Sequence, residues 1–170
     1  MKLINDRRGS VLIEAALVMP IMAILLLATL EFGQAFTAKR RTGQVASMAA
    51  ELVARTPCVT QSDLQDVSAI GGTILKPYTS APLGLRITSV TAQSTVLWSF
   101  GSGTLTPAKT GAAFQLPTSL AGQNKPLIVA EAAYAFTPTL GHFLVSATNF
   151  STVSYHYSRL AGPVPLKTSC

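Results

Sequence analysis

The sequence predicts an α+β protein: a long N-terminal helix, whose first half crosses a membrane, followed by a small head with a short antiparallel sheet. Three observations lead to this fold class. Residues 11–30 form an apolar run with one charged residue, Glu14. The composition then changes sharply at Thr56-Pro57, and the second half of the chain contains four short runs of β-type residues.

The apolar run is long enough to cross a hydrocarbon core of roughly 30 Å. The helical pattern continues to residue 56 and becomes amphipathic, with apolar residues at helical spacing beside a polar face: Val45, Met48, Ala49, Leu52 and Val53. Because a residue before proline avoids the helical region, the helix should end at Thr56. Pro20 has no amide hydrogen and is expected to kink the helix inside the membrane.

In the head, residues 59–77 are expected to form a second helix, with Ser62 as its N-cap and Asp63 and Asp66 near its start. A long loop is expected over residues 101–126, which are rich in Gly, Pro, Ser and Thr. The β-type runs are 85–93, 95–100, 127–136 and 151–160. In the last run Val153, Tyr155 and Tyr157 should share one face of the strand.

The formal net charge is +6, and its distribution argues against nucleic-acid binding. Six of the thirteen basic residues bracket the apolar run, as expected of anchors near lipid headgroups: Lys2, Arg7, Arg8, Lys39, Arg40 and Arg41. The others are scattered singly, and no nucleic-acid motif is present. Because long domains are translocated largely regardless of charge, we expect a cytoplasmic N-terminus and an exported head.

The two cysteines, Cys58 and Cys170, are candidates for a disulfide, because an even pair in an exported domain can be oxidised. Such a bond would tie the C-terminus to the base of the head. The loop-entropy model gives roughly 4–5 kcal/mol for a loop on the order of 100 residues, although native strain often reduces this value. The alternative is a pair of free thiols.

The residues after position 56 do not favour an enzyme. The acidic and histidine side chains there are few and have no metal-ligand spacing: Asp63, Asp66, Glu131, His142 and His156. No serine stands in a nucleophile-elbow pattern. We therefore expect no catalytic residue, no metal site and no cofactor.

Glu14 is the one residue that a simple anchor would not need, since a carboxylate in hydrocarbon costs roughly 2.5–3.5 kcal/mol at a helix centre and less near an end. One interpretation is that its side chain only reaches the headgroups. The other is that a cut between Gly9 and Ser10 creates a free amine one helical turn away. That amine, or the amine of a neighbouring copy, would then pair with Glu14 in a setting of low dielectric constant.

Gly9, four small or apolar residues and then Glu14 resemble the cleavage motif of type IV pilin-like proteins. The longer stretch RRGSVLIEAALVMPIMAILLLATLEFGQAF resembles the N-terminal signature of TadE-like proteins, the pseudopilins of the tight-adherence (Tad/Flp) pilus system. The features that match are Arg8-Gly9, Glu14, Ala15-Leu17, Pro20, the leucines at 25–27 and Glu31-Phe32-Gly33. An aromatic residue often follows the glutamate in this family, whereas here Ala15 does.

The resemblance implies a minor pilin or pseudopilin that a prepilin peptidase processes after Gly9. Residues 1–9 would be the leader, 10–30 the transmembrane half of the helix, 31–56 its amphipathic continuation and 57–170 a periplasmic α+β head. The implied partners are the prepilin peptidase, other pilins, Tad assembly proteins and inner-membrane lipid. The alternatives are an envelope protein with an uncleaved anchor and a binding head, and a secretory protein with an ordinary signal peptide.

Overall fold

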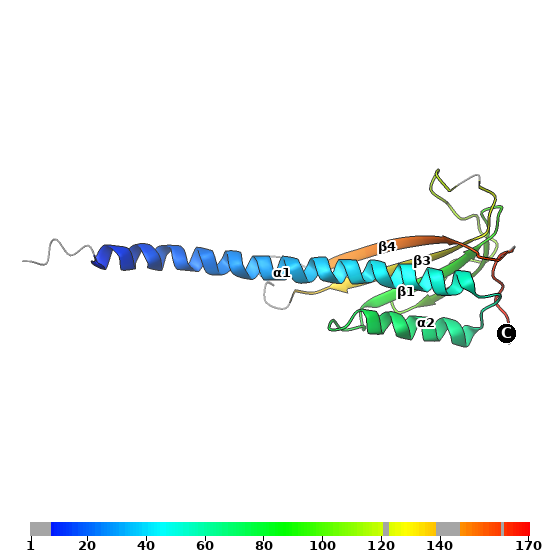
Figure 1. Ribbon diagram of the computed structural model, residues 1–170, viewed down its shortest axis with the longest axis horizontal. Coiled ribbons are helices and arrows are strands. Elements are labelled where there is room, and N and C mark those ends of the chain that lie inside the picture. Colours follow the sequence, from blue (N-terminus) through cyan, green and yellow to red (C-terminus); the bar gives the residue numbers. More distant parts are fainter. Residues whose placement is uncertain (1–7, 121–122, 139–146, 161) are drawn as a thin grey trace, which may run out of the picture.

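A computed structural model describes residues 8–120, 123–138, 147–160 and 162–170. A long helix projects from a small head made of a second helix and a four-stranded antiparallel sheet (Figure 1). The elements are α1 (Arg8–Arg55), α2 (Gln61–Ile74), β1 (Leu83–Val90), β2 (Val96–Ser102), β3 (Leu127–Phe136) and β4 (Thr148–Tyr157). The predicted α+β fold class is confirmed.

Helix α1 has two halves with different surroundings. The membrane half (residues 11–30) extends away from the head, whereas the head half (residues 31–55) lies along β3 and β4 (Figure 1). The buried residues of the head half are mostly alanines, which let the helix backbone approach the sheet closely: Ala38, Ala46, Ala49, Ala50 and Ala54. In the predicted apolar stripe, Val45 and Val53 are also buried, while Leu52 is 40% exposed.

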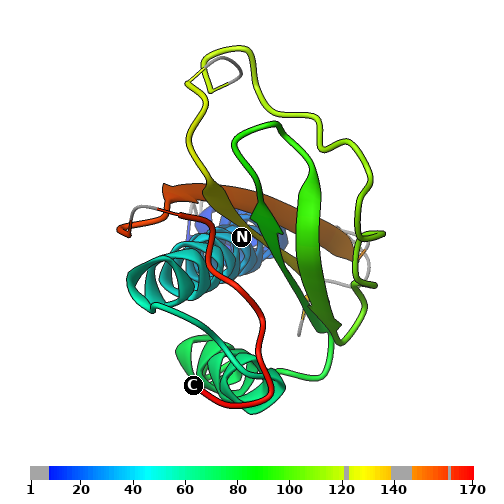
Figure 2. The ribbon, with the colours of Figure 1, turned by 90° about the vertical axis from the view of Figure 1, so that its right-hand side faces the viewer.

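The sheet has the strand order β2-β1-β3-β4, and each neighbouring pair is antiparallel. Figure 2 shows both helices on the same side of this sheet. Alternate strand residues face the helices and form the main core, which includes Leu85, Ile87, Trp98, Ile128 and Tyr134. A smaller cluster of Val90, Leu127 and Val129 packs with Phe114 and Leu116, which come from the loop between β2 and β3.

The prediction that Val153, Tyr155 and Tyr157 share one face of the last strand agrees with this arrangement. Tyr155 and Tyr157 pack against the smaller cluster, away from α1. The intervening residues of β4 face α1, where Thr152 lies beside Gly43 and His156 contacts Glu51. The two tyrosines of β4 therefore lie on the face away from α1, whereas Phe150 packs against the main core on the same side as Thr152 and His156.

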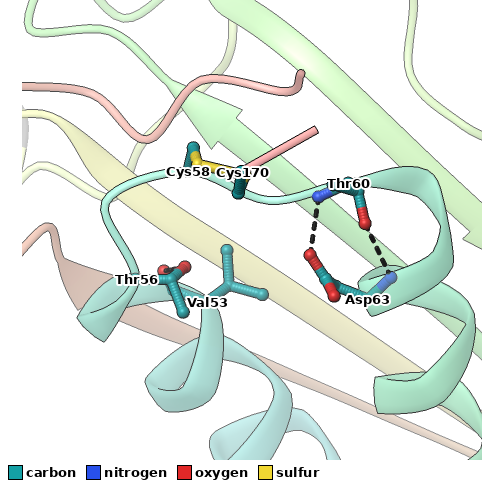
Figure 3. Close-up of a disulfide and its surroundings, with 6 residues drawn as sticks. All are labelled: Val53, Thr56, Cys58, Thr60, Asp63 and Cys170. Carbon is teal, nitrogen blue, oxygen red and sulfur yellow. Dashed lines mark hydrogen bonds between the residues drawn. A yellow bond between two sulfur atoms is a disulfide. The ribbon is translucent and has the colours of Figure 1, made fainter. Parts of the chain in front are cut away.

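Helix α2 begins one residue after Thr60, and the prediction that Ser62 is its N-cap was wrong. The Thr60 hydroxyl accepts a hydrogen bond from the Asp63 amide at 3.2 Å, and the Asp63 carboxylate accepts one from the Thr60 amide at 2.8 Å (Figure 3). This reciprocal capping box satisfies two amide groups at the helix start. The backbone and hydroxyl hydrogen bonds of Thr60 hold the pKa of Asp63 below its ordinary value.

The C-terminal tail crosses the end of the head and is held there by hydrogen bonds to its backbone. The Val59 amide donates to Pro165 O at 3.1 Å, and the Lys167 amide donates to Val59 O at 2.9 Å. The Trp98 indole donates to Val164 O at 2.7 Å, and Val164 is itself buried. These contacts place Cys170 beside the turn that follows α1.

Candidate membrane-anchoring and assembly site

The candidate processing site lies at the start of α1. The helix begins at Arg8, so the backbones of Gly9 and Ser10 are in its first turn. Glu14 follows Ser10 by four residues, which corresponds to about 6 Å along the helix axis, and its side chain is exposed. Residues 1–7 of the expected leader lie outside the described residues.

The membrane half of α1 is apolar around its circumference except at Glu14 and Thr29, and its side chains are exposed except at Ala28, which lies near the sheet. Leu12, Leu17 and Met19 are 71%, 69% and 68% exposed. A helix that is apolar all round is found inside a protein or a membrane. This helix is long and apolar enough to cross a membrane, and it fits a single-pass anchor. It also continues without interruption through Pro20, where the expected kink stays a prediction.

In the head half, Glu51 joins α1 to the end of β4 through a cluster that the sequence analysis missed. Its carboxylate accepts hydrogen bonds from Arg55 at 2.6 Å and from Arg159 at 2.8 Å, and its other oxygen lies 2.7 Å from His156 Nδ1. The hydrogen bond from Arg55, with smaller contributions from the hydrogen bond to His156 and the charge of Arg159, outweighs the effect of burial and holds the pKa of Glu51 below its ordinary value. Arg55 follows Glu51 by four residues on the same helix, but His156 and Arg159 lie 105 and 108 residues away, so no local pattern identifies them.

Arg41 has a different role from the one expected. Its guanidinium group donates to Ile74 O at 2.9 Å and also to Lys76 O, at the C-terminal end of α2. Terminal carbonyls of a helix carry partial negative charge, and a cation there is stabilising. Arg41 therefore joins the two helices, whereas Lys39 and Arg40 remain exposed.

Cys58 and Cys170 are brought together, with their Cα atoms 6.0 Å apart and their sulfurs joined (Figure 3). This separation lies within the range usual for disulfides. Cys58 follows the end of α1 by three residues, so the pair connects the C-terminus to the end of the head that lies away from the projecting half of α1 (Figure 1).

The described residues contain no group of three histidine, cysteine, aspartate or glutamate side chains that could hold a metal ion. His156 contacts Glu51 as described above, and His142 lies outside the described residues.

Comparison with known proteins identifies the same segment. The family model described as TadE-like protein matches residues 9–51, from the glycine at the candidate cut to the head half of α1. No curated protein and no solved structure matches the chain. TadE-like proteins are pilus components and not an enzyme family. The resemblance to the TadE-like family that the sequence predicted is thus confirmed, over residues 9–51.

Proposed function

We propose that this chain is the precursor of a minor pilin or pseudopilin that takes part in assembling a Tad-type pilus. The observation that carries the proposal is the TadE-like match, which begins at Gly9, includes Glu14 and covers the exposed membrane half of α1. An apolar helix beyond a folded head provides both a membrane anchor and a surface for packing against other pilin helices. The head, residues 57–170, would face the periplasm and contact other pilus components.

Processing would occur at the Gly9-Ser10 peptide bond. A prepilin peptidase would add water across this bond, leaving a carboxylate on Gly9 and a free amine on Ser10. Glycine suits the position before the cut because it has no side chain to hinder approach to the backbone. The residues that remain would begin with Ser10, so almost all of α1 would be retained.

The new amine gives Glu14 an opposite charge in a region where an unpaired carboxylate is costly. The amine of the same chain lies one helical turn away, and the amine of a neighbouring subunit could reach the exposed Glu14 side chain from outside. We infer that pairing with a neighbour aligns subunits during assembly. The pairing would be strong because the surroundings have a low dielectric constant.

The cleavage step is tested by Gly9→Arg, with Asp6→Arg as a control that adds a cation before the site without changing it. Gly9→Arg should leave a precursor nine residues longer than the mature protein, and Asp6→Arg should mature normally. Normal electrophoretic maturation of Gly9→Arg would contradict the proposed cut.

The assembly step is tested by Glu14→Ala and Glu14→Gln, measured by cleavage and by the amount of pilus in the sheared fraction. Both variants should be cleaved, and both should lower pilus output, because the amide in Glu14→Gln keeps the shape but not the charge. Wild-type piliation by either variant would argue against a charge pairing.

A single-pass envelope protein with an uncleaved anchor is the alternative function. It would carry the same helix and head, but all variants at Gly9 would have the same length as the wild-type chain.

A further inference from the structure

We propose that the junction between the membrane half of α1 and the head binds an anionic phospholipid, with one acyl chain in an apolar groove and the headgroup near three exposed cations. The inference goes beyond the pilus role and depends only on α1 crossing a membrane. It concerns described residues of α1, β3, β4 and the turn after α2.

The groove has a volume of about 610 Å³ and lies between α1 and the membrane-facing end of the sheet. Its lining includes Leu25, Ala28, Phe32 and Ala35 on α1, with Phe136 and Phe150 opposite. This volume is within the range of small-molecule sites, roughly 300–1,000 Å³. The lining is almost entirely apolar; Glu31, which also contributes, is 5% exposed and is engaged within the protein.

The position of the groove identifies its occupant. The apolar run ends at Leu30, so Leu25 and Ala28 lie within the stretch that crosses the hydrocarbon core. Ala35 lies about 7–8 Å beyond Leu30 along the helix axis. One end of the groove therefore opens among acyl chains and the other among headgroups, and a lipid tail can enter without leaving an apolar environment.

Aromatic side chains lie at the same height along the α1 axis as the groove. Phe32 and Phe36 are 75% and 62% exposed although they lie beyond the apolar run. The Tyr78 hydroxyl donates to Gln34 O at 3.1 Å. The Tyr78 ring packs edge-on against the Phe136 ring, with the two ring centroids 6.0 Å apart. Tyrosine and other aromatic residues near the headgroups are typical of proteins that sit against a bilayer surface.

Three cations lie just above this aromatic level. Lys39 and Arg40 are exposed on α1, about 14–15 Å beyond Leu30, and their long side chains lean back toward the N-terminus. Lys76 is exposed, and its carbonyl accepts from Arg41, which places it at a similar height. Such side chains can extend toward a phosphate while their stems cover apolar surface.

The proposal is tested with the full chain in vesicles of phosphatidylglycerol and phosphatidylcholine, using phosphatidylglycerol with a photoreactive group on one acyl chain. Mass spectrometry should find adducts on α1 residues 11–30 and also on the peptides that contain Phe136 and Phe150. Adducts confined to residues 11–30 would overturn the proposal. Crosslinks from the groove to a second copy in place of lipid adducts would also overturn it.

A filling variant provides the specificity control. Ala35→Trp should reduce the adducts on the Phe136 and Phe150 peptides to background and leave those on residues 11–30 unchanged. Thr37→Trp, on an exposed face of the same turn, should leave all adducts unchanged. If Ala35→Trp fails to fold, the wild-type adduct map still decides the question.

The headgroup is tested by replacing Lys39, Arg40 and Lys76 with serine together. The groove adducts should fall when the labelled lipid is phosphatidylglycerol and should differ little when it is phosphatidylcholine. Equal labelling by both lipids in the wild-type chain would refute recognition of an anionic headgroup. None of these results depends on cleavage after Gly9, so they can fail independently of the pilus role.

Discussion

The two halves of α1 are one continuous helix, yet their apolar side chains have different surroundings. In the membrane half, large side chains such as Leu12 and Met19 point outward on every side and are more than two-thirds exposed. In the head half, small residues such as Ala49 and Ala50 are fully buried against the sheet. The head half therefore finds its partner within the chain, whereas the membrane half requires lipid or another helix.

This contrast shows why residue size matters as much as hydrophobicity along the helix. Alanines bring the helix axis close to a sheet, so any added volume there must displace packed atoms. Leucine, isoleucine and methionine side chains in the other half are exposed, so added volume there has space. The contrast can be tested by changes that affect one half and leave the other unchanged.

The largest effect on the head should come from losing the Cys58–Cys170 link. Cys170→Ser is expected to lower the free energy of unfolding of the head by about 2–5 kcal/mol, since the unfolded chain would regain the freedom of a long loop. Denaturant unfolding of the full chain in detergent, with and without reductant, measures this change. Mass spectrometry without reduction should find the two cysteines linked, and free thiols in both would refute the link.

A charge at the centre of the membrane half should have the next largest effect, and it should act on insertion. Met22→Arg is expected to cost about 2.5–3.5 kcal/mol for insertion of the helix. The fraction of chain in the membrane pellet measures the effect. Gln44→Arg, exposed in the head half, is the control and should insert normally. Equal insertion of both variants would contradict a membrane location for residues 11–30.

Added volume distinguishes the two halves directly. Ala49→Leu is expected to destabilise the head by about 1–3 kcal/mol, because the added atoms have no space against the sheet. Ala23→Leu makes the same chemical change on the exposed membrane half and should leave the unfolding midpoint of the head unchanged. A head that tolerates Ala49→Leu would mean that the head half is not closely packed.

The smallest expected effect is a loss of head stability at acidic pH. Because the pKa of Glu51 in the folded head is below its ordinary value, the stabilisation is present above that ordinary value and is lost as pH falls through the folded pKa. The unfolding midpoint should therefore fall as the pH drops below the ordinary value of 4.5 for a glutamate carboxyl, and Glu51→Gln should reduce this fall. Asp66→Asn, which removes an exposed carboxylate of α2, is the control. An unchanged pH profile in Glu51→Gln would show that the cluster contributes nothing.

Much of the fold could be predicted because its signals are local. The change in composition at Thr56-Pro57, the apolar run and the residues typical of strands each depend on neighbouring residues. The strand order β2-β1-β3-β4 and the pairing of Glu51 with His156 depend on contacts across most of the chain, and no single segment encodes them. Likewise, Arg41 follows two other cations, and only the position of α2 distinguishes its role.

At the start of α2 the relevant pattern was present but was assigned to the wrong residue. Thr60 and Asp63 have the spacing of a capping box, with aspartate in the place of the usual glutamate. Ser62 also has the chemistry of an N-cap, and the choice between the two residues depends on where the chain leaves the turn after Cys58. For the membrane half, Gly9 and Glu14 were recognisable from sequence alone, and their roles in processing and assembly stay predictions.

The most direct test of the account is the N-terminal sequence of the mature protein isolated from membranes of cells with an active prepilin peptidase. The account predicts Ser10 as the first residue, so that the membrane half is retained and Glu14 becomes the fifth residue. Met1 as the first residue would indicate an uncleaved anchor. A start beyond Phe36 would mean that the membrane half is removed as a signal peptide, and this would contradict the account entirely.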